Sequence, residues 1–199
     1  HMISTPGPNM TLCKLKKQRR NSCQLTLDPN TANRLLSLSG GNRKVTWGAK
    51  QPYADHPERF DVCPTVLCKE SLTGRCYWEA EWDGDDARIG VTYKGIGRKG
   101  GRDCELGYND KSWSLYYGSD RFSVWHNNKR TRIRIQPSVS RRIGVYLDCG
   151  AGALSFYRVS SDGLTLLHRF TSSFTEPLYL GFGVYINSSV NTGKERDIF

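Results

Sequence analysis

The spacing of three glycines, Gly95, Gly97 and Gly100, is the clearest pattern in the sequence that suggests phosphate chemistry. A G-x-G-x-x-G run lets the backbone approach a phosphate closely, and in dinucleotide folds it follows a strand and opens a helix. A strand is predicted at residues 88–93, but residues 102–109 indicate a short strand and a turn, not a helix. The run also lacks the G-K-[ST] of a P-loop and the companion motifs of a kinase. The sequence therefore predicts a hairpin loop here.

No arrangement of catalytic side chains stands out either. The chain contains Ser, His and Asp, but it has no G-x-S-x-G elbow, which positions the nucleophilic serine of many hydrolases. Glu79 and Glu81 are candidates for acid–base chemistry, but alternate residues of a strand share one face, and we expect this face to be solvated. We therefore expect a non-enzymatic domain, with any ligase activity in other domains of a longer protein.

The cysteine pattern favours free thiols. There are seven cysteines, an odd number, and no C-x-x-C pair. A secreted disulfide framework favours an even number in a shorter chain, and a zinc site needs clustered Cys and His. His56, His126 and His168 each stand alone. These observations predict a reducing, cytoplasmic environment with no bound metal or cofactor.

The positive charge is concentrated in a few segments. The formal net charge is +10, and 15 of the 29 Lys and Arg lie in residues 14–20, 94–102 and 129–142, which contain no acid. Such segments attract nucleic acid, anionic lipid or an acidic protein, although solvated loops and a linker have the same composition. No apolar run is long enough to cross a bilayer. Residues 1–22 are polar, basic and aperiodic, and we interpret them as a disordered linker that begins with a tag remnant.

From Cys23 onward the pattern is typical of short β-strands. In residues 77–82 the two tryptophans and Ala80 share one face, and residues 141–159 alternate in the same way around a glycine-containing turn, as in a hairpin. Residues 130–135 alternate arginine with Thr and Ile. Many short strands with almost no helix predict two packed antiparallel sheets, a β-sandwich. Further strands are expected at 24–27, 34–38, 43–47, 65–69, 87–93, 104–108, 112–117, 121–126, 164–170 and 178–186.

Five stretches of the chain resemble the PRY–SPRY domain family. The L-D-P, W-E-V and L-D-Y-E hallmarks of the family appear as Leu27-Asp28-Pro29, Trp78-Glu79-Ala80 and Leu147-Asp148-Cys149-Gly150, with departures at Ala80, Cys149 and Gly150 that fall in structural strands. The resemblance covers residues 23–190 in order. The sequence is especially similar to the fish versions of this domain at the C-terminus of tripartite-motif ubiquitin ligases and NOD-like receptors. It is also similar to the related copies in fish venom toxins. The five stretches are LTLDPNTA (25–32), PERFD (57–61), VLCKESLTGRCYWEAEW (66–82), GVYLDCGAGALSFYRV (144–159) and FTEPLYLGFGVY (174–185).

The resemblance implies an all-β fold, a bent two-sheet antiparallel sandwich of the concanavalin-like jelly-roll type with one or two short helical turns. The PRY part would cover about residues 23–72 and the SPRY part about residues 73–195. It also implies a non-catalytic module that binds a protein partner, as the target-binding domain of an innate-immune or ubiquitin-ligase protein. Oligomerisation would be set by domains outside this sequence.

In the family, variable loops at one end of the sandwich form a shallow pocket. These loops correspond to residues 47–60 and 94–103, the turn before Arg121 and the residues after Asn187. Tyrosine offers a large apolar face with a polar tip, and a basic loop beside it would favour a carboxylate or a phosphate. The partner-binding residues expected from this mapping are Tyr53, Asp55, Arg98, Lys99, Arg102, Tyr116, Tyr117 and Tyr185.

Two alternatives to protein recognition remain open at this point. RNA could bind the basic segments, among them Arg130, Arg132 and Arg134, although the chain has no RNA-binding motif. A phosphorylated small molecule could bind beside Arg98 and Arg102, as the resemblance to some intracellular members implies. The sequence does not identify the partner.

Overall fold

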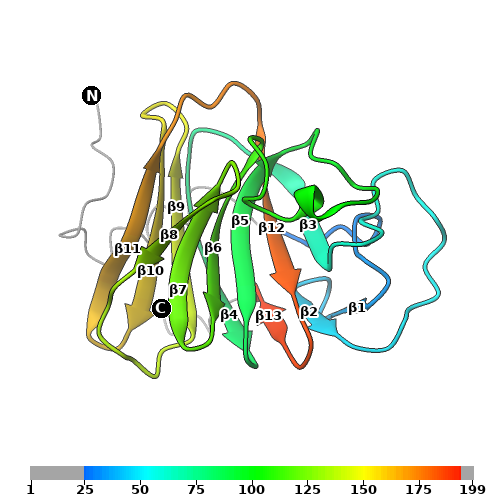
Figure 1. Cartoon of the computed structure of the whole chain (residues 1–199), viewed down its shortest axis with the longest axis horizontal. Helices are drawn as coiled ribbons and strands as arrows, with labels where there is room; N and C mark the ends of the chain where they lie inside the picture. The colour runs from blue at the N-terminus through cyan, green and yellow to red at the C-terminus, as the bar shows by residue number, and fades with distance from the viewer. Residues whose placement is uncertain (1–24, 194–199) are drawn as a thin grey trace.

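The computed structural model describes residues 25–193, which form two antiparallel sheets and almost no helix (Figure 1). The linker predicted over residues 1–22 lies outside this range. The seven-stranded sheet contains, in spatial order, β1 (Leu36–Ser39), β2 (Lys44–Trp47), β13 (Ser189–Asn191), β4 (Arg75–Asp83), β9 (Arg142–Asp148), β10 (Ala153–Ser160) and β11 (Gly163–Thr171). The six-stranded sheet contains β3 (Thr65–Leu72), β12 (Leu178–Val184), β5 (Ala87–Tyr93), β6 (Ser112–Gly118), β7 (Arg121–His126) and β8 (Lys129–Ile133).

The core lies between the two sheets because each strand turns its apolar residues toward the opposite sheet. On β4 these are Trp78, Ala80 and Trp82, and on β12 they include Leu180 and Phe182, all of them buried. Burying one such side chain contributes roughly 1.5–3 kcal/mol, so the alternation determines which face of each strand is inside. The predicted sandwich is confirmed, as are the hairpin at β9–β10 and the arginine-bearing strand at β8.

Two predicted strands are absent. Of the predicted strand at 24–27, residues 25–27 are described, and only Leu27 pairs, in an isolated bridge with Cys68. Residues 104–108 begin at the last residue of a 3₁₀ helix, η1 (Arg102–Cys104), and continue as turns that lie over the outer face of the six-stranded sheet. Gly107 has a φ of +90°, and a Cβ there would lie 2.5 Å from the Cβ of Trp125. The backbone binds side chains instead of a strand, since the Gly107 N–H donates to the Ser112 hydroxyl at 2.7 Å.

The expectation of a solvated face at Glu79 is wrong. Glu79 is 1% exposed, and its carboxylate accepts hydrogen bonds from the hydroxyl of Tyr77 at 2.6 Å and from Nε of Arg142. Tyr146 and Tyr157 are also buried on this outer face of the seven-stranded sheet. Strand alternation separates the two faces of a sheet, but it does not show that the polar face is exposed.

Within residues 25–193, no helix has the length and apolar character that a transmembrane span requires.

Candidate functional site

An open pocket of about 540 Å³ lies at one end of the six-stranded sheet. Five separate segments meet there: the end of β2, the residue before β3, the β4–β5 turn, the end of β6 with the turn that follows it, and the residues after β12. The pocket is lined by Trp47, Pro64, Asp85, Asp86, Tyr116, Gly118, Ser119, Tyr185 and Ile186.

Two of the predicted tyrosines, Tyr116 and Tyr185, line this pocket and contact each other. Tyr117 packs inward against Trp82, with ring centroids 4.8 Å apart, so its neighbour Tyr116 points to the outer face. The rings of Tyr116 and Tyr185 meet edge to face at 6.0 Å. The Tyr116 hydroxyl donates to Asp86 Oδ2 at 3.1 Å, and burial, with the negative charge of Asp86, raises the pKa of Tyr116 to about 12. Tyr116 therefore remains a neutral hydrogen-bond donor at neutral pH.

A buried arginine on β5 supports both tyrosines. Arg88 is 3% exposed, and its Nε donates to the Tyr185 hydroxyl at 3.0 Å. Its Nη1 donates to the carbonyl of Leu106 at 3.2 Å and to the hydroxyl of Ser114 at 3.0 Å. The carboxylate of Glu105 lies 3.4 Å from Nε and also accepts from Tyr185. Burial opposes the charge of Arg88, but the Tyr185 and Glu105 contacts raise its pKa above the usual value, so it stays charged.

The guanidinium of Arg88 also lies against three aromatic rings. The distances from its carbon to the ring centroids are 4.7 Å for Tyr116, 5.1 Å for Tyr108 and 5.4 Å for Trp125. Tyr108 and Trp125 are stacked on each other with centroids 4.7 Å apart. We call the five residues Trp125, Tyr108, Arg88, Tyr116 and Tyr185 the aromatic strip.

Several of these residues were not predicted from the sequence. They are Arg88, Tyr108 and Trp125 of the aromatic strip, Glu105, which compensates the charge of Arg88, and Asp86 in the pocket. The available signal was Arg88 itself, the only charged residue in the strand Ala87–Tyr93. A buried arginine in such a strand requires hydrogen-bond acceptors and a carboxylate on the same sheet face, because an unpaired buried charge is strongly unfavourable.

The predicted basic loop residues, Arg98, Lys99 and Arg102, do not line the pocket. Arg98 donates to the carbonyls of Glu58, Lys94 and Ile96 at 2.6, 2.9 and 3.2 Å. Burial lowers the pKa of Arg98. The Glu58 contact attaches the loop that follows β5 to the segment before β3, and the contacts to Lys94 and Ile96 hold the backbone of the loop itself.

Lys99 makes a similar attachment. Its ammonium group lies 3.1 Å from Asp55 and 2.8 Å from the carbonyl of His56, and the hydrogen bond from Lys99 lowers the pKa of Asp55. The Gly100 N–H donates to Asp61 at 2.8 Å. Arg102, at the start of η1, is exposed.

The last predicted residue is Tyr53, which packs against the main hydrophobic core. Its hydroxyl donates to the carbonyl of Leu36 at 2.7 Å, and the guanidinium of Arg59 lies 4.8 Å from its ring. Tyr53 and the inward-facing Tyr117 are therefore half-buried packing residues, whereas Tyr116 and Tyr185 present surface to the pocket.

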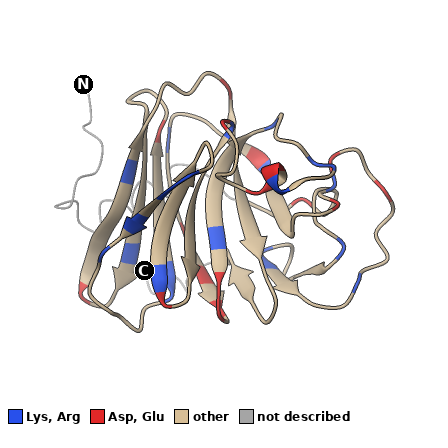
Figure 2. Ribbon diagram, viewed as in Figure 1, with Lys and Arg blue, Asp and Glu red and all other residues tan. Residues whose placement is uncertain are grey.

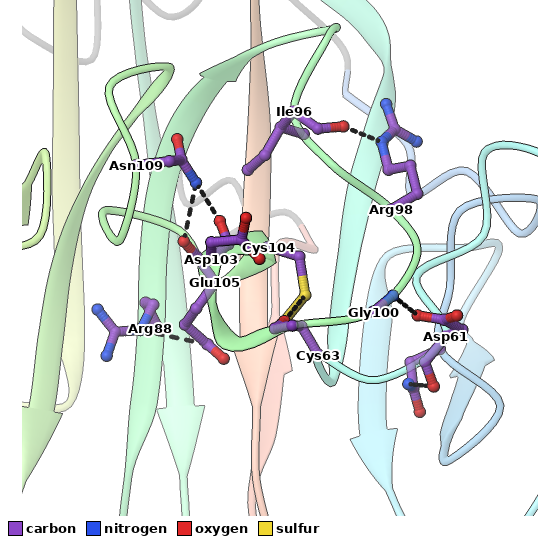
Figure 3. The surroundings of a disulfide bond; sticks show 12 residues. Asp61, Cys63, Arg88, Ile96, Arg98, Gly100, Asp103, Cys104, Glu105 and Asn109 are labelled. Carbon is purple, nitrogen blue, oxygen red and sulfur yellow. Dashed lines mark hydrogen bonds and ion pairs between the residues drawn. A yellow bond between two sulfur atoms is a disulfide. The ribbon is translucent and has the colours of Figure 1, made fainter.

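The free-thiol prediction is wrong for two cysteines, because Cys63 and Cys104 form a disulfide (Figure 3). They are 41 residues apart, and they meet because Phe60, Ile96 and Leu106 form a small separate core beneath the two loops. This pairing arises from tertiary folding, so sequence spacing carried no signal for it. Because disulfides persist mainly in oxidising compartments, Cys63 and Cys104 no longer support the prediction of a reducing environment.

The remaining candidate chemistry is limited. Cys68 is buried, and burial raises the pKa of its thiol, so it is a poor nucleophile. In the part of the chain that the structure covers, no three or more His, Cys, Asp and Glu side chains gather in a way that could hold a metal ion.

The β4–β5 turn that carries Asp85 and Asp86 depends on a glycine. Gly84 has a φ of +99°, and a Cβ there would lie 2.1 Å from the carbonyl oxygen of Asn187. Gly84→Ala is expected to lower the free energy of unfolding by about 2–3 kcal/mol in urea denaturation. Gly74→Ala is the control, since Gly74 has a φ of +66° with open space around it, and it should lose about 1 kcal/mol. Equal losses would show that the turn yields without strain.

Comparison with known proteins places this geometry in a family. Residues 25–72 match the SPRY-associated domain model, PRY, and residues 75–195 match the SPRY domain model. The chain is 45% identical to stonustoxin subunit beta of Synanceia horrida over 80% of its own length and 23% of the toxin subunit. It is 41% identical to tripartite motif-containing protein 16 of Mus musculus over 81% of its length and 29% of that protein. The chain thus spans about a quarter of the length of these relatives.

Two solved structures have the same fold. The stonustoxin structure superposes with a TM-score of 0.83 at 41% identity, over 94% of this chain and 29% of the toxin chain. The crystal structure of the TRIM65 PSpry domain superposes with a TM-score of 0.82 at 26% identity, over 96% of this chain and 100% of the other. With both domain models matched in order and the two-sheet fold shared, the chain belongs to the PRY–SPRY family.

Proposed function

We propose that this domain recognises a protein partner through the pocket and the adjoining aromatic strip. The observation that carries the proposal is the arrangement of Tyr116 and Tyr185 over the buried Arg88, whose Nε and Nη1 donate hydrogen bonds within the fold. Aromatic side chains that are fixed before binding give large contact area at a small entropic cost, which is why they dominate protein-recognition surfaces. SPRY domains are a protein-interaction module family, which agrees with this geometry.

The basic residues support this proposal more than they support phosphate binding. Arg98 already donates to a backbone carbonyl of the neighbouring segment, and Lys99 already pairs with the Asp55 carboxylate, so a phosphate would have to replace those contacts. Arg130 and Arg132 lie on β8, an edge strand, where exposed charge prevents pairing with other chains. If RNA binding through β8 were the main activity, affinity would fall steeply with added salt.

We further propose that the domain is the target-binding part of a longer protein, such as a tripartite-motif ligase or an innate-immune receptor. A cytoplasmic location would fit the tripartite-motif relatives, whereas the Cys63–Cys104 disulfide fits an oxidising compartment. Thiol alkylation of the protein in its native cell, followed by mass spectrometry of these two cysteines, distinguishes the two environments.

The pocket tyrosines give a direct test. Tyr116→Ala/Tyr185→Ala is expected to weaken partner binding by about 30-fold or more, because buried aromatic contacts of this kind contribute about 2 kcal/mol or more. The measurement is a pull-down from cell lysate with quantitative mass spectrometry, followed by calorimetry on the partner retained by the wild type.

Tyr179→Ala provides the matched control. Tyr179 is a half-buried tyrosine near the other end of β12, the strand that leads into Tyr185. It lies about 20 Å from Tyr185 at the rise of a β-strand, too far away to belong to the pocket. Partners retained equally by all three proteins would show that the pocket is not the recognition surface.

A further inference from the structure

The pocket has a charge opposite to that of the chain as a whole. The chain carries +10, yet the pocket is lined by two carboxylates, Asp85 and Asp86, and by no Lys or Arg. Figure 2 shows the same contrast, with acidic colour at the β4–β5 end of the sheets and basic colour spread over β7, β8, β10 and β11. We propose that this pocket binds a lysine or arginine side chain of the protein partner, an inference that rests on the protein-recognition function proposed above.

The negative charge of the pocket is not neutralised from within the fold. Asp86 accepts hydrogen bonds from two neutral groups, the hydroxyls of Tyr116 and Ser188, at 3.1 and 3.3 Å. Asp85 is exposed, and among residues 25–193 neither aspartate has a Lys, Arg or His nitrogen within 4.0 Å. The buried Arg88 does not supply the missing charge, because Glu105 lies 3.4 Å from it.

A basic residue also lies near the turn, but it is held elsewhere. Arg141 donates to the carbonyl of Gly84 at 2.6 Å, and its guanidinium lies 5.7 Å from the ring of Trp82. It forms no ion pair with Asp85 or Asp86 and does not line the pocket. The two carboxylates therefore remain available to a cation from outside.

The rest of the pocket suits the other parts of a basic side chain. A cation beside Asp86 would also face the ring of Tyr116, which attracts positive charge through its π-system. The aliphatic stem of Lys or Arg would cover apolar surface at Trp47, Pro64 and Ile186, and Ile186 is 60% exposed in the unbound domain. A phosphate or carboxylate ligand would instead meet two like charges.

The test is peptide selection on the whole chain. A displayed library of random 12-residue peptides is selected against the wild type, and the enriched peptides are expected to share a Lys or Arg. One enriched peptide is then synthesised with this side chain and with a neutral counterpart, citrulline for Arg or acetyl-lysine for Lys. Calorimetry should show that the neutral peptide binds about tenfold more weakly.

Variants of the domain complete the experiment. Asp85→Asn/Asp86→Asn should weaken the basic peptide about tenfold and remove the preference over the neutral peptide. Asp110→Asn/Asp162→Asn makes the same change in net charge at two exposed aspartates outside the pocket, and it should leave affinity within about twofold. Melting temperatures of both variants establish that they are folded.

The outcomes separate the inference from the function on which it rests. Peptides without a basic residue that bind the Asp85→Asn/Asp86→Asn protein normally, but lose affinity for Tyr116→Ala/Tyr185→Ala, would overturn the cationic specificity and leave protein recognition standing. Peptides that bind both variants as well as the wild type would overturn both proposals. A library that yields no enriched sequence would also count against both.

Discussion

Replacing Arg88 with alanine is expected to lower the free energy of unfolding by about 3–5 kcal/mol, the range for breaking a buried ion pair by removing one partner. The substitution leaves the Glu105 carboxylate without its cation. It also removes the donors to the Leu106 carbonyl and the Ser114 hydroxyl. Urea denaturation measures the loss, and the thermal midpoint should fall by about 10 °C.

Two further substitutions make this experiment specific. Arg121→Ala removes an exposed arginine at the start of β7, and its effect should stay within about 0.5 kcal/mol. Arg88→Lys keeps the charge but loses the planar fork that contacts several acceptors and three rings, so it should recover only part of the loss. An Arg88→Ala protein as stable as the wild type would show that the aromatic strip does not depend on its central cation.

Removing the disulfide is expected to have a comparable effect on stability. Cys63 and Cys104 close a loop with a sequence separation of 41, for which loop-closure entropy predicts a loss of about 4 kcal/mol in the Cys63→Ser/Cys104→Ser protein. Amide hydrogen exchange should accelerate most in residues 48–63 and 94–104, because these segments are attached to each other by Arg98, Lys99 and the disulfide.

Cys149→Ser is the control for this measurement, since Cys149 is half-buried and forms no disulfide. It should change stability by less than about 1 kcal/mol. If a reducing agent opens the Cys63–Cys104 bond, as alkylation would verify, and the thermal midpoint does not change, the disulfide does not stabilise the two loops.

The architecture could be predicted from the sequence because strand alternation is a local signal. Trp78, Ala80 and Trp82 are apolar at every second position, and burying them requires a second sheet. The same alternation separates Tyr116 from Tyr117: Tyr117 shares a face with Leu115, which belongs to the core, so Tyr116 must face outward. The outward direction of Tyr116 is therefore encoded locally in the sequence.

The buried Glu79, the disulfide and the pocket depend on contacts between segments that are distant in the sequence, and no local pattern encodes such contacts. Glu79 is buried because Tyr77 and Arg142 bind it, and Cys63 meets Cys104 only after two loops pack on a shared apolar cluster. The acidic pocket also depends on such contacts, since its lining comes from five separate segments. The basic composition of residues 94–102 predicted a binding site for an anionic group. In the structure, Arg98 and Lys99 instead bind the segment before β3.

Hydrogen exchange of the domain with its captured partner, or with a selected peptide, tests the proposed recognition surface most directly. Binding should slow exchange in residues 83–88 and 185–188, which flank the pocket, and leave residues 94–104 and the β10–β11 hairpin unchanged. Protection confined to residues 94–104 or to β8, with the pocket segments exchanging as in the unbound domain, would contradict the account.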